Sequence, residues 1–105
     1  MAGKTRKQQI EEMLAEEPND PELRYALAME YVSAGDDPAA VQCFQELAGQ
    51  SPDYVPTYFH LARALSRLGR TDEARSVVER GVAAARGKGD LHAAGELEGL
   101  LYELE

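Results

Sequence analysis

The hydrophobic positions of this 105-residue chain recur every three or four residues, which is the spacing of amphipathic α-helices. Six such segments follow one another, and none alternates residue by residue as a half-buried β-strand does. The connections between them span about two to six residues, which is short enough to make successive helices antiparallel neighbours. The pattern therefore predicts an all-α chain of two helical hairpins with one further helix at each end.

Cap and stop residues predict where these helices begin and end. Thr5 and Gln8 have the spacing of a capping box and open a first helix over residues 4–17. Most later helices are expected to begin at the N-caps Asp20-Pro21, Asp37-Pro38, Thr71 and Asp90. They are expected to end at Gly35, Gly49, Gly69 and the break Gly87-Lys88-Gly89. The fourth helix has no such cap and is expected from about Val55.

Three glycines inside the last two helices need a separate explanation. Gly81 is expected to weaken the fifth helix. Gly95 and Gly99 are four residues apart, and close helix packing explains them better than a membrane span because glutamates lie beside them. The apolar stripe of the last helix is predicted to consist of Leu91, Ala94, Leu97, Leu101 and Leu104.

The chain repeats itself at an offset of 34 residues. Identical pairs at this offset include Pro18 and Pro52, Leu27 and Leu61, Ala28 and Ala62, Gly35 and Gly69, and Ala40 and Ala74. The four alanines would let paired helices approach closely, and a larger side chain there would force the helices apart. Because one hairpin cannot bury its own apolar stripe, each copy is expected to cover its neighbour.

These positions resemble the tetratricopeptide repeat, in which a large residue, a leucine, a small residue and an aromatic are followed by an alanine, an aromatic and a proline. The first copy supplies Leu27, Ala28, Tyr31, Ala40, Phe44 and Pro52, and the second supplies Tyr58, Leu61, Ala62, Ala74 and Val78. Arg24 and Arg86 depart from the pattern at its first large position and at its closing proline.

The resemblance implies a right-handed α-α superhelix, a solenoid of about six antiparallel helices. It divides a single domain into four parts. These are a half-repeat helix over 4–17, full repeats over 21–54 and 55–88, and a terminal capping helix over 90–105.

The net charge of −8 disfavours nucleic acid and anionic membranes as partners. No apolar run approaches the roughly 18 residues that a membrane helix needs. The single Cys43 allows no intrachain disulfide, so a reducing cytoplasm is the expected location. The charge is unevenly spread, because residues 8–62 carry −10 and residues 63–88 carry +4.

No catalytic, metal or cofactor site is predicted. Cys43 lies beside Phe44 and is interpreted as a small buried hydrophobe. His60 and His92 are interpreted as having no acidic or cysteine partner at ligand spacing. The glycine motifs of phosphate-binding loops are absent. The chain is therefore expected not to be an enzyme.

The resemblance implies instead a concave groove, lined by the first helix of each pair, that holds a peptide or helix of a partner protein. By helical geometry the groove residues are Tyr25, Met29 and Val32 on helix 21–34, and Phe59, His60, Arg63, Ser66 and Arg67 on helix 55–68. Tyr25 and Phe59 fit packing between the repeats about equally well. The chain would then serve as an adaptor or scaffold.

The composition of the groove suggests its ligand. Some family members grip a C-terminal carboxylate with lysines and asparagines, but this chain offers Tyr25, Met29 and His60 there, so that specificity is not expected. Arg63 and Arg67 are four residues apart and of like charge, which favours an acidic counterpart. The hypothesis is a partner segment with apolar and acidic residues.

A second hypothesis is a structural protein that self-associates. The acidic face of one copy would meet the basic face of another and extend the superhelix into homo-oligomers.

Overall fold

A computed structural model of the chain describes residues 3–104, and these contain six α-helices and no strand. The helices are α1 (Arg6–Glu16), α2 (Pro21–Ser33), α3 (Asp37–Gln50), α4 (Pro56–Arg67), α5 (Thr71–Gly87) and α6 (Leu91–Glu103). The all-α prediction is confirmed.

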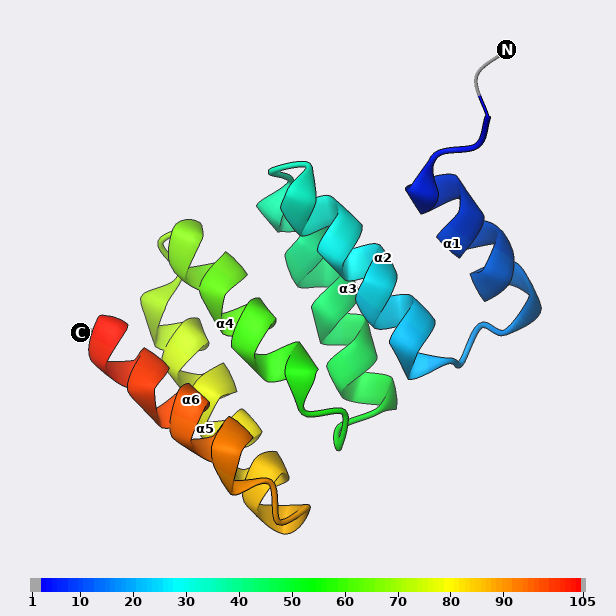
Figure 1. The fold of residues 1–105 in the computed structure, drawn as a ribbon. Helices are drawn as coiled ribbons and strands as arrows, with labels where there is room; N and C mark the ends of the chain where they lie inside the picture. Colours follow the sequence, from blue (N-terminus) through cyan, green and yellow to red (C-terminus); the bar gives the residue numbers. More distant parts are fainter. Residues whose placement is uncertain (1–2, 105) are drawn as a thin grey trace.

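The helices form a curved row in which each one packs against the next along the chain (Figure 1). In this view α2 lies in front of α3 and α6 lies in front of α5, and α4 also contacts α6. The row measures 47 × 29 × 20 Å, with α1 at one end and α6 at the other. This arrangement is a helical repeat solenoid, in which each unit is covered by its neighbours.

Most of the expected helix ends are confirmed by hydrogen bonds. The backbone N–H of Gln8 donates to Thr5 Oγ1, and the N–H of Thr5 donates to Gln8 Oε1, which completes the capping box. Asp20 and Asp90 accept from backbone N–H groups of the helices that follow them. Gly35 ends its helix with a φ of +74°, a conformation that favours glycine.

Two predicted N-caps are wrong by one residue. Asp36, not Asp37, caps α3, and Arg70, not Thr71, precedes α5. The preceding glycine explains both shifts. After Gly35 and Gly69 the next backbone N–H bonds back to the closing turn of the previous helix, at Tyr31 O and Leu65 O. The residue that follows the glycine is thereby fixed as the N-cap, and in the second repeat it is an arginine that supplies no capping side chain.

The four repeat alanines, Ala28, Ala40, Ala62 and Ala74, are all completely buried in one core. Their small side chains let the two helices of each pair approach, as the sequence predicted. The larger side chains that fill the same core without any exposure are Phe44, Leu65 and Val78.

Gly81 has a packing role that the sequence analysis missed. It lies in the middle of α5, and a Cβ atom added there would stand 2.5 Å from Tyr58 Cβ and 3.0 Å from Leu97 Cδ1. Real Cβ atoms essentially never come as close as the first of these distances. Glycine therefore allows α5 to contact α4 and α6 at the same point.

The last helix differs from its prediction. Leu91 is 75% exposed and does not belong to the apolar stripe, whereas Leu100 is buried beside Ala94, Leu97 and Leu104. Gly95 and Gly99 pack against nothing within 4 Å, so the expected close contact at these glycines is absent from the described residues. They lie on a part of α6 that no other described helix covers.

Replacing Gly81 by alanine is expected to lower the free energy of unfolding by about 1–3 kcal/mol, because the added methyl group overpacks the contact with Tyr58. Chemical denaturation followed by circular dichroism measures this change.

The matched control is Gly99→Ala, since Gly99 is also inside a helix but has open space around it. There the substitution is expected to raise the free energy of unfolding by about 0.5–1 kcal/mol. Equal effects at the two positions would contradict the packing role of Gly81.

Candidate functional site

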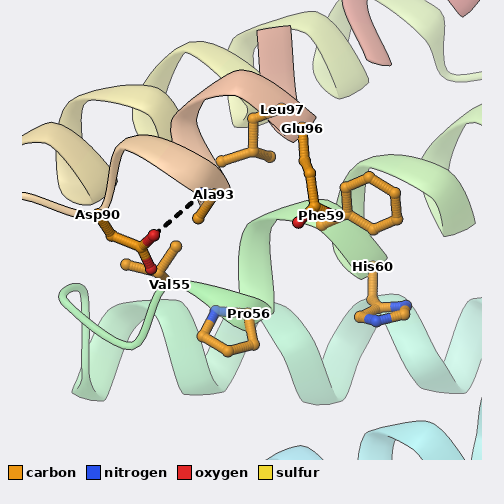
Figure 2. A pocket seen from close by; sticks show the side chains of 8 residues that line it. All are labelled: Val55, Pro56, Phe59, His60, Asp90, Ala93, Glu96 and Leu97. Carbon is orange, nitrogen blue, oxygen red and sulfur yellow. Dashed lines mark hydrogen bonds between the residues drawn. The ribbon is translucent and has the colours of Figure 1, made fainter. Parts of the chain in front are cut away.

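An apolar hollow of about 270 Å³ lies between α4 and α6 (Figure 2). It is lined by Val55, Pro56, Phe59, His60, Asp90, Ala93, Glu96 and Leu97. Phe59 and His60 come from α4, while Ala93 and Leu97 face them from α6. The hollow is the space left where these two helices stand side by side.

The start of α6 determines the shape of this hollow. Asp90 accepts a hydrogen bond of 3.0 Å from the backbone N–H of Ala93, drawn as a dashed line in Figure 2, and so fixes the first turn of the helix. The next turn then places Leu97, which is almost completely buried, at the hollow. Because Ala93 has a short side chain, space remains between α6 and Phe59.

A second hollow of about 170 Å³ continues along the same two helices. It is lined by Arg63, Ser66 and Arg67 of α4, by Leu100 and Glu103 of α6, and by Leu104, the C-cap of α6. On α4 the residues of the two hollows are spaced three or four apart, as on one face of a helix. The α4–α6 groove, as we name these two hollows together, is apolar at one end and charged at the other.

Arg67 is held by the chain itself. Its Nε and Nη2 atoms donate to both carboxylate oxygens of Asp37, on α3, at 2.9–3.1 Å. This hydrogen bonding raises the pKa of Arg67 further above its ordinary value. The paired arginine therefore joins α3 to α4 and offers little unmatched charge to a ligand.

Arg63 has a different environment although it lies only one turn away. Its guanidinium carbon stands 5.5 Å from the centre of the Phe59 ring, within the range of a cation–π contact. Within residues 3–104 no carboxylate lies within 4.0 Å of it. Arg63 is thus the positive group of the groove that the described part of the chain leaves unmatched.

His60 and Tyr25 belong to an aromatic cluster that joins the two repeats. The His60 ring stacks on Phe44 at 6.2 Å and meets the edge of Tyr25 at 5.8 Å. Tyr25 also lies 5.7 Å from the ring of Tyr54. Burial, and then the charges of Arg63 and Arg67, lower the pKa of His60.

The structure separates the eight groove residues proposed from the sequence into two groups. Five of them line the α4–α6 groove, namely Phe59, His60, Arg63, Ser66 and Arg67. Tyr25, Met29 and Val32 are half-buried on α2 and pack against the main core, and none of them lines either hollow. Tyr25 was interpreted from the sequence either as a groove residue or as a residue that packs between the repeats. Its ring contacts fit packing between the repeats.

The half of the groove that α6 supplies was missing from the sequence analysis, which treated residues 90–105 as a cap. These residues are Asp90, Ala93, Glu96, Leu97, Leu100, Glu103 and Leu104. A signal was present, because helices 21–34, 55–68 and 90–105 alternate with the others along the chain. Alternate helices of an antiparallel row lie in the same layer, so α6 was to be expected beside α4.

His92 does have an acidic partner, contrary to the sequence analysis. Its Nε2 atom lies 2.6 Å from Glu96 Oε1, one helical turn away, and both side chains are exposed. Within residues 3–104 no group of three or more histidine, cysteine, aspartate or glutamate side chains is placed to hold a metal ion.

Comparison with known proteins places this architecture in a family. A sequence profile described as tetratricopeptide repeat matches residues 31–96. The chain belongs to the tetratricopeptide repeat family. It is 32% identical over 96 residues to the TPR repeat-containing protein PA0015 of Pseudomonas aeruginosa, and the match covers 91% of each chain.

Two solved structures share the fold. A tetratricopeptide repeat domain protein from Salinibacter ruber, solved by NMR, is 39% identical with a TM-score of 0.79, over 84% of this chain and 89% of that one. PcrH, crystallised with the chaperone binding region of PopD, is 19% identical with a TM-score of 0.85, over 93% of this chain and 74% of that one. Within residues 3–104 no helix is both long and apolar enough to span a membrane.

The environment of His60 predicts its titration. An NMR titration of the imidazole should give a midpoint below the ordinary pKa of 6.5, and the substitution Arg63→Gln should raise it by removing one positive neighbour. A midpoint at or above 6.5 would contradict the burial and charge that we assign to this ring.

The same shift makes stability depend on pH. Because the pKa of His60 is lower in the folded than in the unfolded chain, the unfolded state takes up the proton first as the pH falls. The contribution of His60 to the free energy of unfolding should therefore decrease as the pH falls through about 6.5, and level off below the folded pKa.

Proposed function

We propose that this protein is an interaction module that binds a segment of another protein in the α4–α6 groove. The observation that carries the proposal is that both hollows lie between the same two helices, so that an apolar space and an unmatched arginine share one face of α4. The α4–α6 groove has the features of a binding site, because its apolar surface supplies affinity while one charged group fixes the orientation of the ligand.

The family and one structural neighbour support this proposal. Tetratricopeptide repeat proteins are generally protein-interaction modules, and PcrH, which has the same fold, was crystallised with a segment of another protein. The identity to PcrH is too low to transfer its partner, so the chemistry of the ligand is argued from the groove itself.

The apolar hollow would receive a large apolar side chain of the partner. Pro56 and Phe59 present carbon surface there, and the short side chain of Ala93 leaves the space open. An apolar side chain that enters would remove its own surface and that of Phe59 from water, which is favourable by roughly 25 cal/mol per Å².

Arg63 would form an ion pair with an acidic residue of the partner that lies near the apolar side chain in the first hollow. The partner carboxylate is expected on the α4 side of the groove, because Glu103 lines the opposite side and would repel it. Arg67 contributes less, since Asp37 already holds its guanidinium group. The proposed ligand is thus a short segment with an apolar anchor and a nearby acidic residue.

An array of peptides about a dozen residues long, each with one leucine or phenylalanine and an aspartate at varied spacing, tests this preference. We expect some spacings to bind and the aspartate-to-lysine versions to lose binding. Equal binding of acidic and basic versions would contradict the role of Arg63.

Variants of the protein test where the peptide binds. Arg63→Glu is expected to weaken the best peptide at least about tenfold in isothermal titration calorimetry. Arg80→Glu is the matched control, because Arg80 also stands over an aromatic ring, at 5.7 Å from Tyr58, but belongs to α5 and lines neither hollow. A similar loss in both variants would point to net charge rather than to the groove.

Filling the hollow is a second test of the same site. Ala93→Leu places a larger side chain in the apolar space and should abolish entry of the anchor while keeping the fold, because leucine is a good helix former. Unchanged peptide affinity in a folded Ala93→Leu variant, checked by circular dichroism, would exclude the hollow as the binding site.

A further inference from the structure

Opposite charges line the two walls of the α4–α6 groove. Arg63 and Arg67 belong to α4, whereas Glu96 and Glu103 belong to α6. Asp90, the N-cap of α6, adds a third carboxylate at the first hollow, the apolar one. The acidic residue proposed above for the partner matches only the α4 wall, so the negative charges of the α6 wall call for a second, basic group.

The carboxylates of the α6 wall are not matched by lysine or arginine. No basic side chain of residues 3–104 lies within 4.0 Å of the carboxylate of Asp90 or Glu103, although Lys88 is only two residues before Asp90. Glu96 contacts His92 at 2.6 Å, and this pair is ionic only when the imidazole is protonated. The α6 wall therefore presents negative charge to the groove.

The α4 wall supplies no permanent positive charge to the first hollow. It contributes Pro56, Phe59 and His60 there, opposite the start of α6 (Figure 2). Burial lowers the pKa of His60, and the nearby arginine charges lower it further, so the imidazole is neutral at pH 7. The carboxylates of Asp90 and Glu96 consequently meet no opposite charge across the first hollow.

The unmatched charges are separated along the groove as well as across it. The starts of α4 and α6 line the first hollow and their ends line the second, so the two helices run in the same direction. Glu96 stands on the α6 wall of the first hollow, and Arg63 on the α4 wall of the second. Glu103 shares the second hollow with Arg63, whose opposite charge offsets it, so the first hollow is the more negative one.

We propose that the partner segment carries a basic residue beside its apolar anchor, which pairs with Glu96 and Asp90 on the α6 wall while the acidic residue pairs with Arg63 on α4. This inference rests on the proposed function and extends it to the second charge of the ligand and the direction of binding. Because each charge has one place, a segment whose basic residue precedes the anchor lies with its N-terminus at the starts of α4 and α6. A segment whose acidic residue comes first lies in the opposite direction.

The contact between His92 and Glu96 does not prevent this pairing. The two side chains are 87% and 53% exposed, and exposed pairs contribute little to stability. The carboxylate of Glu96 can therefore exchange its partner for a basic group of the ligand at little cost.

Three peptides about a dozen residues long test the second charge. All have one leucine anchor and differ in their charges: lysine before and aspartate after the anchor, the reverse order, and alanine in place of the lysine. In isothermal titration calorimetry both lysine peptides should bind about threefold more tightly than the alanine peptide, the gain expected of a partly exposed ion pair. The gain should disappear at about 500 mM salt. Equal affinities of the three peptides at low salt would overturn the proposal.

Reversing one charge of the α6 wall tests the place of the lysine. Glu96→Lys should remove the gain from lysine and favour a peptide with glutamate in its place, a swap of preference that a merely structural role of Glu96 would not produce. Glu98→Lys is the matched control, because Glu98 is on the same helix and pairs with Arg86 but lines neither hollow. It should keep the preference for lysine. The same swap in both variants would assign the effect to net charge and overturn the proposal.

A nitroxide label at the N-terminus of each lysine peptide tests the direction of binding. In NMR spectra of the protein, the peptide with lysine first should broaden the amide signals of Thr57 and Asp90, at the first hollow. The peptide with aspartate first should instead broaden those of Ser66 and Leu104, at the second. The same pattern with both peptides would overturn the inferred control of direction.

The alanine peptide separates this inference from the proposed function. If it binds and loses affinity in Arg63→Glu, while added lysine has no effect, the second charge is overturned and the proposed function stands. If no peptide binds, both are overturned. Sedimentation equilibrium of the protein without peptide covers one further occupant, since self-association that is lost in Ala93→Leu would assign the groove to a second copy of this chain and overturn the proposal.

Discussion

Helices α4 and α5 approach so closely that a single methyl group at position 81 would collide with Tyr58. The buried alanines at positions 62 and 74 serve the same close contact, and alanines 28 and 40 serve it in the first repeat. Interiors are packed too densely to absorb an extra side chain, so the spacing of these pairs is fixed by the smallness of a few residues. The positions of the following helices depend on that spacing.

The groove is a consequence of this spacing. A Cβ atom at position 81 would also stand 3.0 Å from Leu97 Cδ1 of α6, so the lack of a side chain there lets α5 approach both α4 and α6. Asp90 then sets the start of α6, and the short Ala93 leaves the apolar hollow opposite Phe59. Where α4 meets α2 and α3, the ring of His60, which also borders the groove, packs with the rings of Tyr25 and Phe44 and leaves no hollow between them.

Arg63 and Arg67 have different electrostatic environments and therefore different roles. Arg63 and Arg67 are one turn apart on the same face of α4, yet Arg67 is bound to Asp37 and Arg63 stands over Phe59. The difference arises because the start of α3 reaches the end of α4 but not its middle. A protein with a net charge of −8 thus carries a local positive group beside an apolar hollow.

The sequence by itself determined the helices, the 34-residue repeat and the glycine ends, because periodicity, caps and left-handed turns depend on residues near one another in the chain. It also named Phe59, His60, Arg63 and Arg67, since helical spacing alone places them on one face. Only the tertiary structure decided that α6 supplies the other wall, that Tyr25 packs between repeats and that Gly81 is a contact. These depend on which side chains meet across helices about 20 to 40 residues apart, a property of the packed core that local pattern does not encode.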